Sequence, residues 1–312
     1  MSQNKACRVA FSEALLEEAK KDKDIIVVTT DARGSASVDN FARELPEQFV
    51  EVGIAEQNAV GVAAGLSICG FKPFVCGPAC FLSARSFEQV KVDVAYSKTN
   101  VKIIGVSGGV SYGPLGGTHH ALHDIAAFRA VPNMTVILPS DANLAKAIAR
   151  TLVNHRGPVY VRMGRNPVPV VYSEEPHFEI GKANVLLEGD DIAIIACGEV
   201  VKNAFDAALL LKEKGIYAKV VDMHTLKPID EELIIEIAKK YKVIFTVEEH
   251  NINGGLGDAV AGFLAKYSPK EVIKIALPDE DMITGSQFEI YDYYGLSAEK
   301  IANRVLSELE RR

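Results

Sequence analysis

Residues 49–70 read FVEVGIAEQNAVGVAAGLSICG and predict a helix that begins near Glu56. The next turns of this helix are built from small residues, namely Ala59, Gly61, Ala63, Ala64 and Gly65. Small side chains at helical spacing let a second backbone approach closely, so the pattern is typical of a helix packed tightly against a partner helix. Glu56 would then lie at the edge of an interface from which water is excluded.

Two physical effects compete over the ionisation of Glu56. Removal from water favours the protonated carboxyl, whereas the positive end of the helix dipole favours the carboxylate. A glutamate in a solvated first helical turn is also a common and stabilising placement, and buried carboxylates are rare. The residues by themselves leave both interpretations of Glu56 open.

Outside this stretch, short apolar runs alternate with helical patterns along the whole chain. Most of the runs are continuously apolar, as strands buried on both faces of a parallel sheet are. Alternation of strands and helices predicts right-handed crossovers and open, doubly wound α/β sheets. The predicted strands lie at residues 25–31, 72–77, 101–107, 134–140, 158–163, 192–197, 218–223, 242–249 and 272–278.

One segment, RNPVPVVYSEEPHFEIGKA (165–183), breaks this alternation. It contains several prolines and two adjacent glutamates without a clear period, which is typical of an interdomain linker. We therefore predict two doubly wound domains, residues 1–175 and 185–312. A chain of 312 residues is long enough for each domain to have its own core.

Composition limits the classes of partner. The formal charge is −7 and neither sign forms long blocks, which argues against nucleic acid or an anionic membrane as the main partner. No stretch approaches the roughly 20 apolar residues that span a bilayer, and the N-terminus lacks a signal-peptide pattern. The five cysteines form no CxxC pair, so we expect reduced, mostly buried thiols in a cytoplasmic protein. A metal site at Cys76 and Cys80 would lack the usual spacing.

Five phrases, taken together, resemble the transketolase family. Residues 6–165 resemble the pyrimidine-binding domain of transketolases, and the remainder resembles their C-terminal domain. The resemblance implies a pyrimidine-binding thiamine-diphosphate fold followed by a transketolase C-terminal-like domain. The phrases are VVTTDARGS (27–35), VGIAEQNAVGVAAGLS (52–67), GGTHHALHDIAAFRAVPNMTVILPSD (116–141), GPVYVRMGR (157–165) and VEEHNINGGLGDAV (247–260).

The resemblance implies thiamine diphosphate as the cofactor and relates three residues to it. Glu56 matches the catalytic glutamate that hydrogen-bonds N1′ of the aminopyrimidine and so promotes loss of the thiazolium C2 proton. Asp31 matches an aspartate near the cofactor, and Phe81 matches an aromatic that stacks on the pyrimidine ring. From the residues alone, Asp31 is equally a turn residue at a strand end and Phe81 a core phenylalanine.

The same resemblance implies a sugar-binding set. His119 matches a catalytic histidine that contacts the substrate near the reacting carbon. Arg165 matches an arginine that binds the phosphate end of the sugar, and Ser35 matches a serine in the same pocket. Alternatively, Arg165 only caps the linker. His119 and His123 are four apart on a predicted helical face and could imitate a metal pair, but no third ligand is evident, so we expect no metal site.

The chain also departs from the family pattern. Leu115 stands where the pattern has an aspartate that recognises a sugar hydroxyl, and Ser107, a further substrate-binding candidate, stands where it has a histidine. Pro78 replaces a neighbouring aromatic. A buried leucine cannot accept a hydrogen bond from a hydroxyl. We therefore expect a sugar whose hydroxyl pattern differs from xylulose 5-phosphate, such as a branched, deoxy or sulfonated one.

The diphosphate site of the family has no match here. Family members hold the diphosphate through Mg²⁺ with a GDG motif and a later asparagine, whereas this sequence contains no GDG. The resemblance thus implies that a large N-terminal transketolase subunit supplies the diphosphate and Mg²⁺ sites in an α2β2 assembly. The implied function is the transfer of a two-carbon ketol unit from a ketose phosphate, or a similar anionic sugar, to an aldose.

Other functions remain open at this point. The β subunit of a 2-oxo-acid dehydrogenase E1 component has the same two-domain layout, but it passes an acyl group to a lipoyl domain. Deoxyxylulose-phosphate synthase chemistry is a further enzyme alternative. A non-catalytic homodimeric module is the third, and retention of Glu56, Asp31, Phe81 and His119 argues against it.

Overall fold

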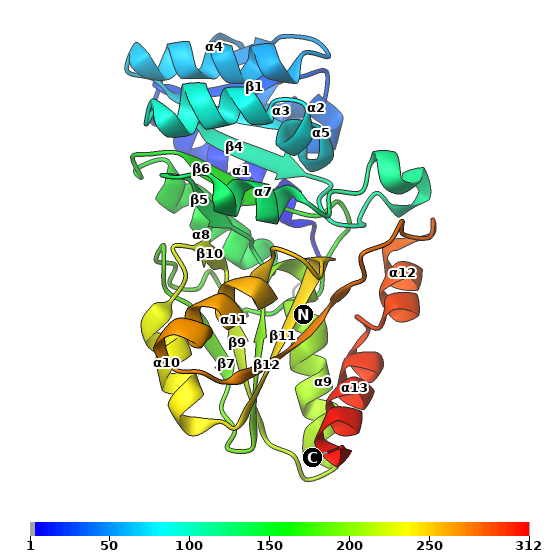
Figure 1. The fold of residues 1–312 in the computed structure, drawn as a ribbon. Coiled ribbons are helices and arrows are strands. Elements are labelled where there is room, and N and C mark those ends of the chain that lie inside the picture. Colours follow the sequence, from blue (N-terminus) through cyan, green and yellow to red (C-terminus); the bar gives the residue numbers. More distant parts are fainter. Residues whose placement is uncertain (1–3, 312) are drawn as a thin grey trace.

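The computed structural model describes residues 4–311, which form two sheets stacked one above the other in Figure 1. In this part of the chain the first sheet has seven strands in the order β10-β5-β6-β4-β3-β1-β2. Every pair is parallel except β10 with β5. The strands are β1 (Ile25–Thr29), β2 (Phe49–Glu51), β3 (Lys72–Pro78), β4 (Lys102–Val106), β5 (Thr135–Ile137), β6 (Val159–Arg162) and β10 (Thr225–Lys227).

Helices cover both faces of the first sheet. One core cluster joins α1, α3 and α8 to one face, and another joins α4, the π-helix η2 and α7 to the other. The helical segments are α1 (Cys7–Ala19), α2 (Arg33–Ala36), α3 (Asp39–Glu44), η1 (Pro46–Gln48), α4 (Glu56–Ile68), α5 (Ala79–Ala84), α6 (Phe87–Gln89), η2 (Val90–Tyr96), η3 (Gly113–Thr118), α7 (Asp124–Ala130) and α8 (Ala142–Leu152).

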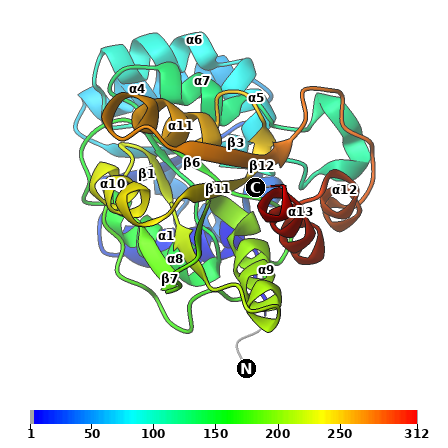
Figure 2. The ribbon, with the colours of Figure 1, turned by 60° about the horizontal axis from the view of Figure 1, so that its bottom comes forward.

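The second sheet, within the described residues, has five strands in the order β12-β11-β8-β9-β7, with only β7 antiparallel. Helices α9 and α13 pack side by side in one core cluster, and both lie on the same side of this sheet in Figure 2. The elements are β7 (Asn184–Leu187), β8 (Ile192–Ala196), η4 (Gly198–Val200), α9 (Val201–Glu213), β9 (Ala218–Asp222), α10 (Glu231–Lys240), β11 (Val243–Asn251), α11 (Leu256–Tyr267), β12 (Glu271–Leu277), α12 (Gln287–Tyr294) and α13 (Ala298–Glu310).

The predicted doubly wound α/β architecture is confirmed, and each predicted strand is present with slightly different ends. Three strands were not predicted: β2, β7 and β10 are short and lie at sheet edges, where few apolar residues mark a strand. Strand β10 comes from the second half of the chain yet completes the first sheet. The two halves are therefore joined by backbone hydrogen bonds as well as by side-chain packing.

The core is also shared between the halves. The cluster beneath α4 and α7 continues into residues of α10 and α11. Among the described residues no helix has the length and apolar character needed to cross a membrane. The predicted linker has little regular structure, with only an isolated bridge between Val168 and Lys5. The exact division at residues 175 and 185 stays a prediction.

Candidate active site

The predicted site residues lie at one edge of the first sheet. Because its strands are parallel apart from β10, their carboxyl ends meet at the same edge, where ligands bind in doubly wound folds. The topology therefore gathers positions that are far apart in the chain. Asp31 and Ser35 follow β1, Glu56 follows β2, Phe81 follows β3, Ser107 follows β4 and Arg165 follows β6.

Glu56 is buried at the first position of α4. Only 2% of its surface is exposed, so the interpretation of a solvated first-turn glutamate is wrong. The Nη1 atom of Arg85 donates a hydrogen bond to Glu56 Oε2 at 2.7 Å. Ala59 and Ala63, one and two turns on, are buried, as close helix packing requires. Glu56 is thus a buried carboxylate with a cationic partner at its open side.

Phe81 and Glu56 together hold a flat group that carries N–H donors. The guanidinium carbon of Arg85 lies 4.6 Å from the centroid of the Phe81 ring, while the same guanidinium hydrogen-bonds Glu56. A planar ring with N–H donors has the same requirements: an apolar face beneath it and an acceptor at its edge. Residues present here therefore fit an aminopyrimidine. The sequence interpretation missed Arg85, which no local pattern distinguishes from a surface arginine.

A row of rings continues from Phe81. His119 stands edge-on to Phe81 and also to Tyr112, with ring centroids 5.3 Å apart in both pairs. The guanidinium carbon of Arg165 lies 4.3 Å from the centroid of the Tyr112 ring. Contacts therefore run without a break from Glu56 to Arg165. His119 occupies the middle of this row and is half-buried.

Arg8 brings Ser35 and Arg165 together. Its Nε donates to the Arg165 carbonyl at 3.0 Å, and its Nη1 donates to the Ser35 carbonyl at 2.6 Å. Burial lowers the pKa of Arg8, and the nearby Arg165 charge lowers it further. Among the described residues, Arg165 Nη1 is buried without a hydrogen-bond partner. Two neighbouring guanidiniums with an unpaired donor suit an anionic group.

Two site candidates have left-handed backbones. Ser107 has φ 56° and only 1% of its surface exposed, and its Oγ has no partner within residues 4–311. Asp31 has φ 55°, but its side chain is exposed and its backbone N–H donates to Glu51 Oε1 at 2.8 Å. Backbone strain and an orphan hydroxyl at Ser107 are typical of a binding position. The hydrogen bond to Glu51 does not join Asp31 to the row of rings.

Two expectations for residues 107–124 are wrong. His119 follows the 3₁₀ segment η3 and His123 precedes α7, so the two histidines do not share a helical face. His123 Nε2 instead lies 3.3 Å from Ser83 Oγ. Leu115 was expected to be buried, but it lies on the short 3₁₀ segment η3 and 44% of its surface is exposed. Residues 4–311 contain no group of three side chains suited to hold a metal ion.

The cysteines are mostly buried, as expected. All five are free, and only Cys69 is exposed. Burial raises the pKa of the Cys76 thiol to about 12 and that of the Cys80 thiol to about 11, so both remain protonated at neutral pH. A metal site that uses these two thiols is therefore disfavoured.

A buried carboxylate beside the site makes stability depend on pH. Burial, followed by the charge of Glu249, raises the pKa of Glu199 from 4.5 to about 7. The folded chain then keeps a proton that the unfolded chain has released, so stability falls as the pH rises from about 5 to 7. We expect Glu199→Gln to raise the free energy of unfolding by up to about 3 kcal/mol at pH 8 and by little at pH 5.

Urea unfolding of the purified chain at both pH values measures this effect. Glu299→Gln, on the exposed start of α13, is the control and should change neither value. A Glu199→Gln effect of equal size at the two pH values would contradict the assignment, because only an ionising group produces the difference.

Comparisons with known proteins agree with this fold. The family model "Transketolase, pyrimidine binding domain" matches residues 3–170, and "Transketolase, C-terminal domain" matches residues 181–301. The chain is 53% identical to one subunit of the apulose-4-phosphate transketolase of Phocaeicola vulgatus, over 98% of both chains. It is 36% identical to the 6-deoxy-6-sulfo-D-fructose transketolase subunit SqwH of a Clostridium species, over 98% of this chain and 95% of that one.

A solved structure extends the agreement to three dimensions. The structure described as a split gene transketolase, inactive beta4 tetramer, superposes with a TM-score of 0.89 at 40% identity, covering 98% of each chain. The predicted resemblance is therefore confirmed. The chain belongs to the transketolase family and has the extent of the C-terminal subunit of a split transketolase.

Proposed function

We propose that this chain is the subunit of a two-subunit transketolase that binds the aminopyrimidine of thiamine diphosphate and the sugar substrates. The observation that carries the proposal is the unbroken row of contacts from Glu56 to Arg165, which crosses His119. One end of the row suits a flat heterocycle and the other suits an anion.

At the cofactor end, Glu56 would accept or hold a proton at its Oε2, opposite N1′ of the aminopyrimidine. Bound thiamine diphosphate would supply the carbon nucleophile that takes up the two-carbon unit. Phe81 would support the ring, since its face is half-exposed and rigid. Burial of Glu56 excludes water, which strengthens its hydrogen bond to the ring nitrogen. Asp31 would lie near the cofactor at this same end of the row.

At the sugar end, Arg165 would bind a phosphate or sulfonate group, with Ser35 beside it. The unpaired Nη1 of Arg165 supports this role, because a buried donor without an acceptor is costly until a ligand supplies one. His119 and Ser107 would contact the reacting part of the sugar. Two relatives are named for an apulose phosphate and a sulfofructose, which supports an anionic ketose other than xylulose 5-phosphate as the donor.

A partner subunit would supply the diphosphate and Mg²⁺ sites in an α2β2 assembly. The relative from Phocaeicola vulgatus is named as one subunit of its transketolase, which supports a partner here. Large apolar side chains are exposed around the helix that carries Glu56: Ile54 and Ile68 at its ends, and Val92 and Tyr96 on η2. Apolar surface of this kind is typical of an interface. Free cysteines, mostly buried, support a cytoplasmic location.

Arg165→Gln tests the sugar end of the proposal in the reconstituted two-subunit enzyme. We expect kcat/KM for a phosphorylated or sulfonated ketose to fall about 10- to 100-fold, because a charge-assisted pair is lost. Turnover of an uncharged ketose should stay within about threefold, since it makes no use of the guanidinium. Steady-state kinetics with a matched pair of ketoses measures the difference.

Arg156→Gln, remote from the sheet edge that carries the site, is the matched control. Equal losses for charged and uncharged ketoses would contradict the role of Arg165. Turnover that requires a lipoyl domain as acceptor, with none for an aldose, would overturn the proposed function as a whole.

A further inference from the structure

Residues 107–124 carry Ser107, Tyr112 and His119, and we refer to them as the sugar loop. Beyond the short segment η3 they contain little regular structure. The loop closes at a neck, where Gly109 N donates to Ala121 O at 3.2 Å and Ala121 N donates to Gly109 O at 2.9 Å. The position of His119 therefore depends on whatever holds this neck.

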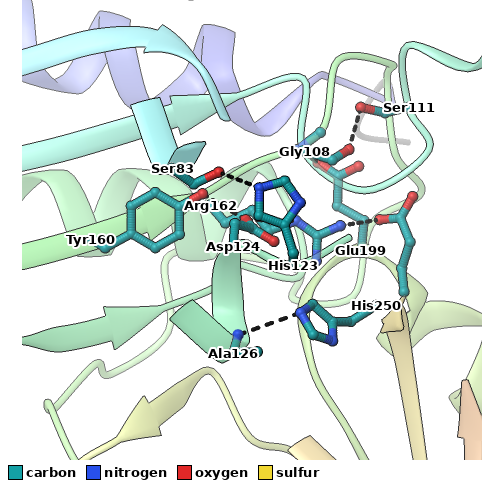
Figure 3. Close-up of polar contacts among 12 residues, drawn as sticks. Ser83, Gly108, Ser111, His123, Asp124, Ala126, Tyr160, Arg162, Glu199 and His250 are labelled. Atoms are coloured by element: carbon teal, nitrogen blue, oxygen red, sulfur yellow. Dashed lines mark hydrogen bonds and ion pairs between the residues drawn. The ribbon is translucent and has the colours of Figure 1, made fainter. Parts of the chain in front are cut away.

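A buried arginine lies beneath the neck. Arg162, at the end of β6, exposes only 5% of its surface. Its Nη2 donates to Glu249 Oε2 at 3.1 Å, and its Nε lies 3.6 Å from Asp124 Oδ2. Figure 3 shows Arg162 close to Asp124, Gly108 and Tyr160. Asp124 ends the sugar loop, whereas Glu249 belongs to β11 in the second half of the chain.

Both ends of the sugar loop are tied to this pair. Glu249 Oε1 accepts the backbone N–H of Val110 at 2.9 Å, just inside the neck, and the side-chain amide of Gln287 at 3.2 Å. At the other end, Tyr160 donates its hydroxyl to Asp124 Oδ2 at 2.6 Å. Through Arg162 and Glu249, the second half of the chain thus reaches the two ends of a loop in the first half.

The neck packs directly on these charges. A Cβ atom built on Gly109 would overlap both Arg162 Nη2 and the Glu249 carboxyl carbon, and one on Gly108 would overlap Arg162. Gly109 also has φ 60°, which a side chain would strain. Because no space separates the neck from the side chains of Arg162 and Glu249, a displacement of these side chains would displace the neck. Loss of Glu249 would leave the buried Arg162 with Asp124, 3.6 Å from its Nε, as its remaining carboxyl partner.

We propose that Glu249, acting through Arg162, is a positioning residue that holds the sugar loop and thereby places His119 and Ser107. The second domain then contributes to sugar turnover through this contact, without touching substrate. The functional half of this inference rests on the proposed function, because it requires that the sugar loop binds the sugar. The structural half, namely that Glu249 and Arg162 hold the sugar loop in place, rests only on the contacts described above.

Glu249→Gln tests both halves. Each oxygen of Glu249 accepts from a donor, so the NH₂ group of a glutamine must face a donor on one side, towards Arg162 or towards Val110. Glu248→Gln is the matched control on the same strand. Glu248 is also buried and also accepts from two donors, the backbone N–H groups of Leu256 and Gly257, but these belong to α11.

The first measurement is amide hydrogen exchange of the purified chain, read by mass spectrometry. We expect peptides within residues 108–124 to exchange at least tenfold faster in Glu249→Gln and to be unchanged in Glu248→Gln. This result needs neither substrate nor partner, so it separates the inference from the proposed function. The inference would be overturned if the sugar loop of Glu249→Gln exchanged its amide hydrogens as slowly as the wild type. It would also be overturned if exchange of the loop were accelerated equally in both variants.

The second measurement is kinetic and uses the assembled enzyme. We expect Glu249→Gln to lower kcat/KM for the ketose about 100-fold, because small displacements of reacting groups have effects of that size. The dissociation constant of the cofactor should stay within twofold, since Glu56 and Phe81 lie outside the sugar loop. An equal loss in Glu248→Gln would mean a general structural effect and would overturn the positioning role.

A second variant covers the case in which Glu249→Gln does not fold. Tyr160→Phe keeps the ring and removes only the hydroxyl that donates to Asp124. We expect faster exchange at the Asp124 end of the sugar loop and a loss of about tenfold in kcat/KM with unchanged cofactor binding. Unchanged exchange together with unchanged kinetics would overturn the inference.

Discussion

Glu56→Gln in the assembled two-subunit enzyme is expected to lower turnover by about 10²- to 10⁴-fold while leaving the complex intact. Removal of a group that holds or transfers a proton in the transition state has effects of this size. Glutamine keeps the volume of the side chain, so the packing of α4 around Ala59 and Ala63 is preserved. Steady-state kinetics at saturating cofactor, with co-elution of the subunits, measures the result.

Glu231→Gln is the control for Glu56→Gln. Glu231 is also a first-turn glutamate, at the start of α10, but it is exposed and far from the sheet edge that carries the site. The turnover of Glu231→Gln should equal that of the wild type. Turnover of Glu56→Gln within about threefold of the wild type would show that Glu56 serves only to stabilise its helix end.

The isolated chain is expected to bind thiamine diphosphate at least 10³-fold more weakly than the assembled enzyme does. Glu56 and Phe81 offer contacts to the ring alone, whereas the diphosphate carries most of the charge of the cofactor. Mg²⁺ requires several oxygen ligands, and residues 4–311 contain no group of three side chains suited to a metal ion. Calorimetry with the cofactor and Mg²⁺ on the single chain measures the affinity.

Removal of Mg²⁺ with a chelator provides the matched comparison. It should abolish tight binding by the assembled enzyme and change nothing for the isolated chain, because this chain is not expected to hold the metal. Micromolar affinity of the isolated chain for the cofactor, corresponding to about −8 kcal/mol, would contradict the division of the site between two subunits.

The sequence alone determined the α/β architecture. Runs such as residues 25–28 and 192–196 are apolar throughout because both faces of these strands are buried, and that pattern is local. Parallel pairing then places the residues after β1 to β4 at one edge. The short strands β7 and β10 escaped prediction because an edge strand needs few apolar residues.

The partners of charged side chains were decided only by the tertiary structure. Arg8 meets Arg165 across 157 positions, and Glu249 meets Val110 across 139. Periodicity records which positions are buried, but it does not record which groups a charged side chain contacts, since that depends on how distant segments of the chain pack together. The burial of Glu56 is the clearest case. Its place at the start of a helix was readable from local sequence, whereas the loss of water and the pairing with Arg85 came from segments folded against it.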